Sequence, residues 1–331
     1  MSDSLRIVQF GLGPIGAATA RCVLKRDNLE LVGAVDVAPS KAGRDVGEVI
    51  GLGRPTGIPV TATLAETLAR TSADAAIHMT TSYFESFTPQ IEELLAAGLD
   101  VVSTSEELSF PWLAHADSAA HVDRLARQAN KTVLGTGINP GYLMDCLPLG
   151  LTGICQRVDH IQITRVINAS QRRGPFQAKI GSGLSVDEFH QRMTAGRMGH
   201  VGLPESVGMI FDSLGRQLVH YESSVEPVVA QERTVTDHFD VAPGQVKGLR
   251  QVARGYDPSG ELVTLEFIAA LAAIGDGDTI RITGQPGLEV ALRGTNGDLA
   301  TVAMAVNAVR RVVTASPGLV TMRDLPPVVC Q

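Results

Sequence analysis

The feature that most constrains this chain is a glycine run, Gly11-x-Gly13-x-x-Gly16, between an expected strand at residues 5–10 and an expected helix at residues 17–26. The strand segment (LRIVQF) is apolar, and the helical segment is rich in alanine and ends in basic side chains. In such a turn the first glycine permits a tight bend, and the second lets the backbone approach a pyrophosphate. The third lets the helix pack closely on the strand.

A carboxylate at the end of the next expected strand strengthens this interpretation. Asp36 ends the segment 29–36, where an acidic side chain binds the ribose 2′-hydroxyl of a dinucleotide. Asp36 favours NAD because it repels the 2′-phosphate of NADP, but Ser40, Lys41 and Arg44 follow closely and could hold that phosphate. The glycine run together with Asp36 predicts a dinucleotide site for NAD or NADP. We expect no flavin, because the glycine run alone does not indicate one and no other flavin-binding feature accompanies it.

The same site draws on other parts of the first half of the chain. Hydroxyl side chains follow the expected strand 73–80, and the carboxyl ends of parallel strands line the ligand crevice. The alternative is a hydroxyl-rich start of a loop. Predicted cofactor-binding residues are Gly11, Gly13, Pro14, Ile15, Gly16, Asp36, Lys41, Thr80, Thr81, Ser82 and Asn139. The amide of Asn139, behind the expected strand 132–137, could bind the nicotinamide carboxamide, or Asn139 could simply form an Asn-Pro turn.

The first half alternates expected strands and helices, and this predicts the fold class. Further strands are expected at residues 59–62 and 100–104, and helices at residues 40–51, 64–72, 86–98 and 118–130. Segment 40–51 could also be irregular. Alternating strands and helices imply parallel pairing with right-handed crossovers, and nearly unbroken apolar strands fit a sheet that is covered on both faces. We therefore predict an α/β fold with a Rossmann doubly wound parallel sheet.

The pattern changes near residue 147. Expected strands lie at 159–168, 225–231, 261–271, 278–284 and 288–294, and expected helices at 185–196 and 204–218. Several of these strands alternate polar and apolar residues, which fits a sheet with one exposed face. We predict an α+β substrate and dimerisation domain with an open mixed sheet. The predicted domains are 1–146, 147–294 and 295–331, the last a helix and tail that return to the Rossmann domain.

Composition excludes several classes of function. Aromatic residues make up 4% of the chain and the net charge is −7, without a basic run, so no nucleic-acid partner is expected. The four cysteines are scattered and the eight histidines lack paired ligand spacing, so we predict no metal site and a reducing, cytoplasmic location. No apolar run approaches the ~20 residues of a membrane span, and the N-terminal residues do not resemble a signal peptide.

Two adjacent carboxylates, Glu106 and Glu107, follow the expected strand 100–104. One interpretation is the first turn of a helix, where acidic side chains suit the positive end of the dipole. The other is a catalytic carboxylate at the edge of the sheet.

Several motifs together resemble a known group. They are FGLGPIG, Asp36, VVSTSEELSFP, GTGINPGYLMD, GHVGLPES and SPGLVTMRDLP. The chain resembles the native amine dehydrogenases and 2,4-diaminopentanoate dehydrogenase, within the dihydrodipicolinate reductase-like superfamily, over essentially its whole length. The resemblance implies a Rossmann domain and a dimer-building α/β domain. It also implies NAD(P)H-dependent reduction of the imine formed from a carbonyl compound and ammonia, together with the reverse oxidative deamination.

Departures from related enzymes narrow the expectation. Dihydrodipicolinate reductases carry a His-His pair and an SGT-type loop, whereas the nearest stretch here is GSGLS at 181–185, so a dicarboxylate substrate is not expected. Homoserine dehydrogenases have Asn-Lys where this chain has Ser105-Glu106.

The resemblance implies that an acidic residue of this segment is catalytic. A carboxylate there would accept a proton from ammonium, return it as water leaves the carbinolamine, and stabilise the iminium cation. Burial would raise its pKa towards the working pH. If the segment is extended, neighbouring side chains point to opposite faces, so only one glutamate faces the hydride. We favour Glu106, because the lysine of the homoserine enzymes aligns there, and keep Glu107 as the alternative.

The predicted substrate pocket has mainly apolar walls, which suits a ketone or aldehyde. Its predicted lining is Phe84, Tyr142, Met144, Ile167, Phe176, Met198 and His200, each of which could instead serve core packing or, for His200, an interface turn. An inward Arg165, Arg172 or Arg173 would favour an amino-acid-like substrate. His78, inside an apolar strand, is expected to be a hydrogen-bonded core residue.

The leading hypothesis is an NAD(P)H-dependent amine dehydrogenase, a homodimer that acts on a small carbonyl compound or amine and ammonia. The alternatives are an amino acid dehydrogenase like 2,4-diaminopentanoate dehydrogenase, an alcohol or semialdehyde oxidoreductase on the same scaffold, and a nucleotide-binding protein without catalytic activity.

Overall fold

The computed structural model describes residues 4–196 and 198–330, which form two compact units. The first unit comprises the chain up to Tyr142 together with the segment from Asn296 onward, and the second is Leu143–Thr295. The predicted domain boundaries lie after residues 146 and 294.

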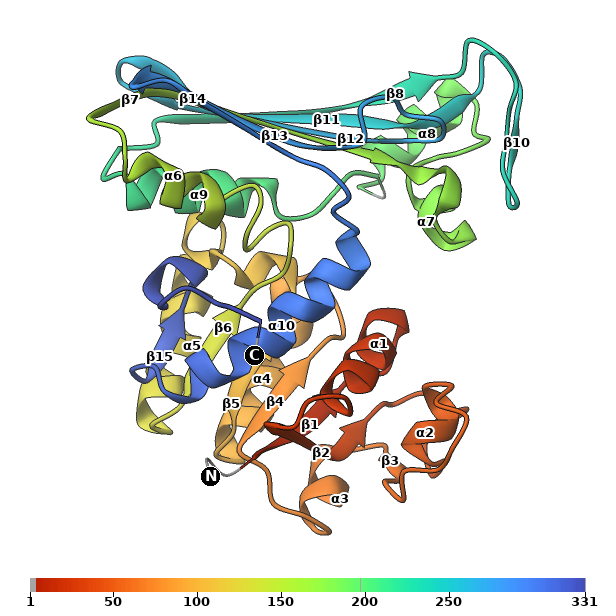
Figure 1. The fold of residues 1–331 in the computed structure, drawn as a ribbon, viewed down its shortest axis with the longest axis vertical. Coiled ribbons are helices and arrows are strands. Elements are labelled where there is room, and N and C mark those ends of the chain that lie inside the picture. The colour runs from red at the N-terminus through yellow and green to blue at the C-terminus, as the bar shows by residue number, and fades with distance from the viewer. Residues whose placement is uncertain (1–3, 197, 331) are drawn as a thin grey trace. The chain divides into compact units, whose positions relative to one another are not determined.

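The first unit is built on a seven-stranded sheet in the order β15-β6-β5-β4-β1-β2-β3, with every neighbouring pair parallel (Figure 1). Its strands are β1 (Leu5–Phe10), β2 (Leu29–Val35), β3 (Val60–Thr61), β4 (Ala75–His78), β5 (Asp100–Ser103), β6 (Thr132–Gly135) and β15 (Gly318–Val320). The strand order reverses between β1 and β4, and ligands of such sheets bind at the carboxyl ends of the strands beside that point. The predicted doubly wound sheet is confirmed.

Helices cover both faces of this sheet because the strands are apolar on both sides. The helices are α1 (Pro14–Val23), α2 (Val46–Val49), α3 (Leu64–Leu68), α4 (Phe84–Ala96), α5 (Ala116–Gln128) and α10 (Gly297–Val313). Val8 and Phe10 of β1 pack in one cluster with side chains of α4 and α5, while Ile7, which precedes Val8, is fully buried outside that cluster. Helix α10 contacts α1 and β5, and of the expected helix 40–51 only α2 is helical.

The second unit is built on a six-stranded mixed sheet in the order β14-β13-β7-β12-β11-β8. Its strands are β7 (Arg157–Asn168), β8 (His220–Val229), β11 (Val246–Asp257), β12 (Gly260–Ala270), β13 (Gly277–Gln285) and β14 (Leu288–Leu292), and β9 (Thr234–Val235) pairs separately with β10 (Asp240–Val241). Strands β7 and β12 are parallel and the other pairs in the large sheet are antiparallel. This unit also confirms the predicted fold class.

The helices of the second unit are α6 (Cys146–Thr152), α7 (Gly174–Lys179), α8 (Val186–Thr194) and α9 (Leu203–Ser213). Helices α6, α7 and α9 lie on one side of the sheet, and the other side carries no helix of the described residues (Figure 1). Phe189 of α8 packs against Leu249 and Phe267. The remaining helical elements among the described residues are short 3₁₀ turns, η1 (Glu106–Leu108), η2 (Pro111–Leu113), η3 (Ala169–Gln171) and η4 (Met322–Asp324).

Strand β11 lies inside this sheet, although the sequence pattern did not predict it. It contains Gly248 and Gly255, which weaken a strand in isolation. A Cβ atom at Gly255 would lie 2.5 Å from a ring carbon of Phe211 and 2.7 Å from Val207, both on α9. The glycine therefore lets α9 pack closely on the sheet, a requirement that local propensity does not reveal.

The uncovered side of this sheet carries ion pairs that cross the strands. Arg254 lies 3.2 Å from Glu222 on β8 and 3.6 Å from Glu261 on β12. Arg250 lies 2.6 Å from Glu266 on β12. These arginines alternate along β11 with buried residues such as Leu249, Gln251 and Ala253, which face the helices. The alternation matches the predicted exposed and packed faces.

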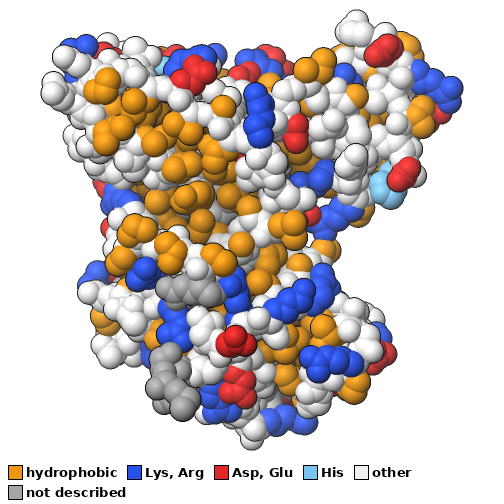
Figure 2. Space-filling view, viewed as in Figure 1, with side chains coloured by type: hydrophobic (Ala, Val, Ile, Leu, Met, Phe, Trp, Pro, Cys, Tyr) orange, Lys and Arg blue, Asp and Glu red, His pale blue; other side chains and the backbone are white. Residues whose placement is uncertain are grey.

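On the face drawn in Figure 2, the described Lys and Arg side chains are interspersed with Asp and Glu and do not form one continuous basic surface. Among the described residues, no helix combines the length and the apolar character needed to cross a membrane.

Candidate active site

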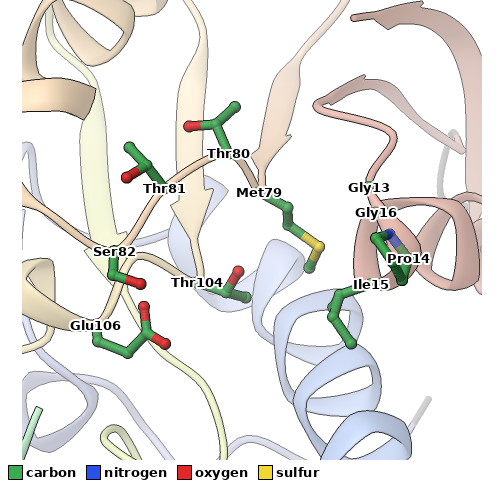
Figure 3. Close-up of a pocket in the computed structure, with 10 residues that line it drawn as sticks. All are labelled: Gly13, Pro14, Ile15, Gly16, Met79, Thr80, Thr81, Ser82, Thr104 and Glu106. Carbon is green, nitrogen blue, oxygen red and sulfur yellow. The ribbon is translucent and has the colours of Figure 1, made fainter. Parts of the chain in front are cut away.

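Two cavities lie in the first unit where β1, β2, β4 and β5 end. The first, of about 200 Å³, is lined by Gly13, Pro14, Ile15, Gly16, Met79, Thr80, Thr81, Ser82, Thr104 and Glu106 (Figure 3). The second, of about 280 Å³, is lined by Phe10, Gly11, Gly13, Val35, Asp36, Val37, Lys41, Met79, Thr80 and Gln90. The cavities share Gly13, Met79 and Thr80, so the start of α1 and the loop after β4 border both.

The three glycines meet different demands. Gly11 has a φ of +92°, and a Cβ there would overlap the carbonyl oxygen of Met79. A Cβ at Gly16 would overlap the carbonyl oxygen of Gly11. A Cβ at Gly13 would meet no atom within 4 Å. The chain itself therefore requires the first and third glycines, whereas the space beside the second is room for a group from outside the chain.

A side chain of β1 and two side chains of the loop after β2 hold the glycine turn. The buried Gln9 amide donates to the carbonyl oxygen of Gly11 over 3.0 Å. The backbone N–H of Leu12 donates to Asp36 over 2.8 Å, and Lys41 Nζ donates both to the Leu12 carbonyl oxygen over 3.0 Å and to Asp36 over 2.7 Å. Asp36 and Lys41 thus form an ion pair on the peptide of Leu12. The first turn of α1 contains no acidic side chain, so its N–H groups and positive dipole end remain available to an anion.

Asp36 is ionised at neutral pH. Partial burial by itself would raise the pKa of this carboxyl, but hydrogen bonds from Lys41 and from the N–H groups of Ala38 and Leu12 lower the pKa below its usual value. Arg44 instead pairs with Glu48 over 2.6 Å.

Of the three candidates for a 2′-phosphate, Lys41 lines the second of these cavities, whereas Ser40 and Arg44 line neither of the two.

Glu106 and Glu107 lie in the 3₁₀ turn η1, so this segment is not extended and its side chains do not alternate between opposite faces of a strand. With three residues per turn, consecutive side chains diverge by about 120°, and the two carboxylates still take different directions. Glu106 lines the first cavity, where its carboxylate lies beside the hydroxyl of Ser82 (Figure 3).

Glu107 turns to the start of α4. Its carboxylate accepts a hydrogen bond from the N–H of Phe84 over 2.5 Å and lies 3.3 Å from His115 Nε2. Its own N–H donates to the carbonyl oxygen of Ser82 over 3.2 Å. An acidic group at the N-terminus of a helix is favourable, so Glu107 stabilises the start of α4, a helix from an earlier part of the chain, and not a helix that the two glutamates themselves begin.

Other predicted pocket residues of the first unit lie at different depths. Phe84 is 1% exposed, and its ring packs against Phe87 and stacks on His115 at 5.1 Å. Tyr142 is half-buried. Asn139 is buried behind β6 and lies outside the lining of both cavities.

In the second unit, Met144 is fully buried in the hydrophobic core beneath α9. Ile167, Phe176 and Met198 are partly buried and pack against the cluster that contains Phe189.

The ring of His200 stacks on Phe267, with ring centroids 4.7 Å apart, and the backbone N–H of His200 donates to Gln251 Oε1 over 2.6 Å.

Two of the three candidate arginines of this unit have defined partners. Arg165 is 3% exposed and lies 2.8 Å from Asp278, which neutralises its charge inside the sheet. The guanidinium of Arg172 lies over the ring of Phe176, 4.7 Å from its centroid, and Arg173 is exposed at the start of α7.

Sequence reasoning missed several lining residues. Phe10, Met79 and Thr104 each lie at or directly after the end of a strand of the sheet, so the rule that located Thr80 could have found them. Gln90, which comes from the middle of α4, carries no such signal.

Comparisons with known proteins identify the family. The family model described as the 2,4-diaminopentanoate dehydrogenase C-terminal domain matches residues 142–330, and the one for the dihydrodipicolinate reductase N-terminus matches residues 5–106. A 2,4-diaminopentanoate dehydrogenase from Acetoanaerobium sticklandii is 30% identical, with 98% of this chain and 94% of the relative covered. The chain belongs to the 2,4-diaminopentanoate dehydrogenase family.

Two amine dehydrogenases extend the comparison. One from Streptomyces virginiae is 23% identical, with 96% of this chain and 95% of the relative covered. A solved amine dehydrogenase from Mycobacterium smegmatis is 26% identical, with a TM-score of 0.86 and with 100% of this chain and 98% of that chain covered. This member of the family is a dehydrogenase that uses NAD or NADP, as the sequence predicted.

The residues present fit a dinucleotide. The open space at Gly13 suits a pyrophosphate, and so does the positive end of α1, whose first turn carries no acidic side chain. The ionised carboxylate of Asp36 suits a ribose hydroxyl.

Matched glycine substitutions test this fit. We expect Gly13→Ala to lower the free energy of unfolding by roughly 1 kcal/mol or less, because the site is a helix N-cap with open space. NADH binding should weaken at least about tenfold, because the methyl group occupies the phosphate position. Gly16→Ala should cost about 3 kcal/mol of stability through the clash with Gly11. Thermal unfolding and NADH fluorescence titration measure both effects; an unchanged NADH Kd for Gly13→Ala would contradict the assignment.

Proposed function

We propose that this enzyme catalyses the reductive amination of a ketone or aldehyde with ammonia, and the reverse oxidative deamination, with Glu106 as the acid–base group. The observation that carries the proposal is the position of the Glu106 carboxylate, which lines the same 200 Å³ cavity as Gly13 and the start of α1. Membership of the 2,4-diaminopentanoate dehydrogenase family and the similarity to amine dehydrogenases support the reaction class.

The nicotinamide cofactor supplies the hydride in one direction and accepts it in the other. Glu106 acts on protons. Its carboxylate accepts a proton from ammonium, so that neutral ammonia can attack the carbonyl carbon. The resulting carboxylic acid returns the proton to the carbinolamine hydroxyl, and water leaves. The carboxylate then faces an iminium cation and stabilises its positive charge.

Hydroxyl groups beside Glu106 would orient it. Ser82 lies next to its carboxylate and Thr104 lines the same cavity (Figure 3). A hydroxyl donor holds a carboxylate in one rotamer, and such orientation matters when a proton must pass to a particular atom. Glu107 has no part in this chemistry in our proposal, because its carboxylate is engaged by the backbone of Phe84 and by His115.

Both nicotinamide cofactors are accommodated in our proposal. With NAD, Asp36 accepts a hydrogen bond from the adenosine ribose. With NADP, Lys41 leaves its ion pair with Asp36 and pairs with the 2′-phosphate. The ion pair of Asp36 and Lys41 over 2.7 Å supports this, because its two charges cancel beside the second cavity.

For the substrate we propose a carbonyl compound without a carboxylate. The supporting observation is the pairing of Arg165 with Asp278, which removes one of the candidate carboxylate-binding cations. We leave Phe84 and Met144 out of the proposed substrate walls because both are almost fully buried. Tyr142, Ile167, Phe176, Met198 and His200 stay in the proposal, and Asn139 stays as a cofactor contact.

A second candidate is an amino acid dehydrogenase that acts on a 2,4-diaminopentanoate-like substrate. The 30% identity to the Acetoanaerobium enzyme over nearly the whole chain favours it. Arg172 would then bind the carboxylate.

We further propose a cytoplasmic homodimer. All four cysteines are thiols, which fits a reducing compartment. The uncovered face of the second-unit sheet presents both signs of charge in rows, and a twofold axis through such a face brings unlike charges of two copies together.

Substitution of the two glutamates tests the catalytic assignment. We expect the wild-type enzyme to oxidise NADH or NADPH with a ketone or aldehyde only when ammonium is present. Glu106→Gln should lower kcat at least about 100-fold with NADH binding preserved, because the proton carrier is lost.

Glu107→Gln is the matched control. It should keep kcat within about threefold and lower the melting temperature by a few degrees, because a helix-terminal charge is lost. Turnover without ammonium, or a larger loss of kcat in Glu107→Gln than in Glu106→Gln, would contradict the proposal.

Lys41→Ala tests the cofactor proposal. Without the lysine, Asp36 faces the 2′-phosphate directly, so the Kd for NADPH should rise at least about tenfold while that for NADH changes less. Arg44→Ala is the matched control, because Arg44 is engaged by Glu48 outside the cavities. Equal effects of Lys41→Ala on both cofactors would refute a phosphate-binding role.

Charge reversal tests the dimer. Arg250→Glu with Arg254→Glu makes the uncovered sheet face strongly acidic, so dimer dissociation should increase at least about tenfold through like-charge repulsion. Arg127→Glu, an exposed arginine paired with Asp123 in the first unit, is the control. Sedimentation velocity at several protein concentrations measures both; an unchanged dimer in the double variant would place the interface elsewhere.

A further inference from the structure

His78 is a buried polar residue at the meeting point of the active-site loops. It is the last residue of β4, is 0% exposed, and pairs in register with Ser103, the last residue of β5. The rings of Phe10 and Phe87 flank it at 5.6 and 6.4 Å. A buried imidazole in apolar surroundings requires hydrogen-bond partners, and the identity of those partners indicates what this one does.

One side of the imidazole reaches the segment that carries Glu106. Nδ1 lies 2.9 Å from Ser103 Oγ, and Ser103 Oγ accepts a hydrogen bond from the N–H of Ser105 over 3.1 Å. Ser105 is 2% exposed and directly precedes Glu106 in the chain. The histidine and the serine therefore hold the peptide from which Glu106 extends.

The other side of the imidazole reaches the cofactor cavities. Nε2 lies 2.6 Å from Gln90 Oε1 and 3.0 Å from Thr80 Oγ1, and the Thr80 hydroxyl donates to Gln90 over 2.6 Å. Thr80 lines both cavities and Gln90 lines the second. The same ring thus touches the wall of the cofactor site.

The partners define one proton arrangement. Gln90 Oε1 can only accept, so Nε2 carries the hydrogen and Nδ1 accepts from the Ser103 hydroxyl. The Ser103 oxygen in turn accepts from Ser105. Burial lowers the pKa of His78 to about 4. The ring is therefore neutral. Ser105 donates to Ser103, Ser103 donates to His78, and His78 donates to Gln90, so the hydrogen bonds form one chain with a single direction.

We propose that His78 is a positioning residue that holds the Glu106 segment and the cofactor wall in one geometry, through Ser103 on one side and through Gln90 and Thr80 on the other. The link through Ser103, which concerns turnover, rests on the proposed role of Glu106. The link through Gln90 and Thr80, which concerns cofactor binding, does not depend on that role.

Separate substitutions of the two arms test the proposal on the full-length enzyme. Ser103→Ala removes the link to Ser105, so kcat should fall about tenfold while the NADH Kd stays within about twofold. Gln90→Met removes the other link, so the NADH Kd should rise about fivefold or more. Ser103→Thr, which keeps the hydroxyl, should restore kcat to within about threefold of wild type.

Imidazole ¹⁵N spectra provide a readout independent of activity. In the wild type at pH 7 we expect His78 as the neutral Nε2–H tautomer, and the Gln90→Met variant should shift its Nε2 signal. An imidazolium or an Nδ1–H tautomer would overturn the proposal. So would Ser103→Ala and Gln90→Met variants that lower only the melting temperature, with kcat and NADH Kd unchanged. If the wild type lacks ammonium-dependent turnover, the proposed function fails, while the NADH Kd and the spectra still decide the cofactor arm.

Discussion

The structure depends on the close contact of backbone with backbone at the glycine turn. Gly11 lies against the carbonyl of Met79, and Gly16 lies against the carbonyl of Gly11, so neither position can carry a side chain. This contact brings the start of α1 to the loop after β4. The cavity that results lies between the positive end of a helix and a row of hydroxyl groups, with open space beside Gly13.

Neighbouring carboxylates acquire different roles from their surroundings. Asp36 is kept ionised by Lys41 and two backbone N–H groups. Glu106 faces the cavity, whereas Glu107, one residue later, is engaged by the start of α4 and by His115. Adjacent side chains of a 3₁₀ turn point in different directions. For this reason Glu106 is a candidate proton carrier, whereas its neighbour Glu107 caps a helix.

Much of the first unit follows from local sequence. Apolar strands, terminal glycines and the position of Asp36 predict a parallel doubly wound sheet and the place of its ligand, and the strands β1, β2 and β4 lie where the pattern put them. Strand β11 did not follow, because Gly255 serves contact with Phe211 on a helix distant in sequence. Likewise no local pattern places Gln90, in the middle of α4, beside His78.

By itself, the sequence determined the fold class, the family, the cofactor type and the segment that holds the acidic pair, since these depend on periodicity and on motifs contiguous in the chain. Only the tertiary structure decided which glutamate faces the first cavity, which of Lys41 and Arg44 borders the second cavity, and that Arg165 is neutralised by Asp278. The physical reason is that these outcomes depend on side-chain direction and on partners far apart in sequence, which the packing of separate elements sets.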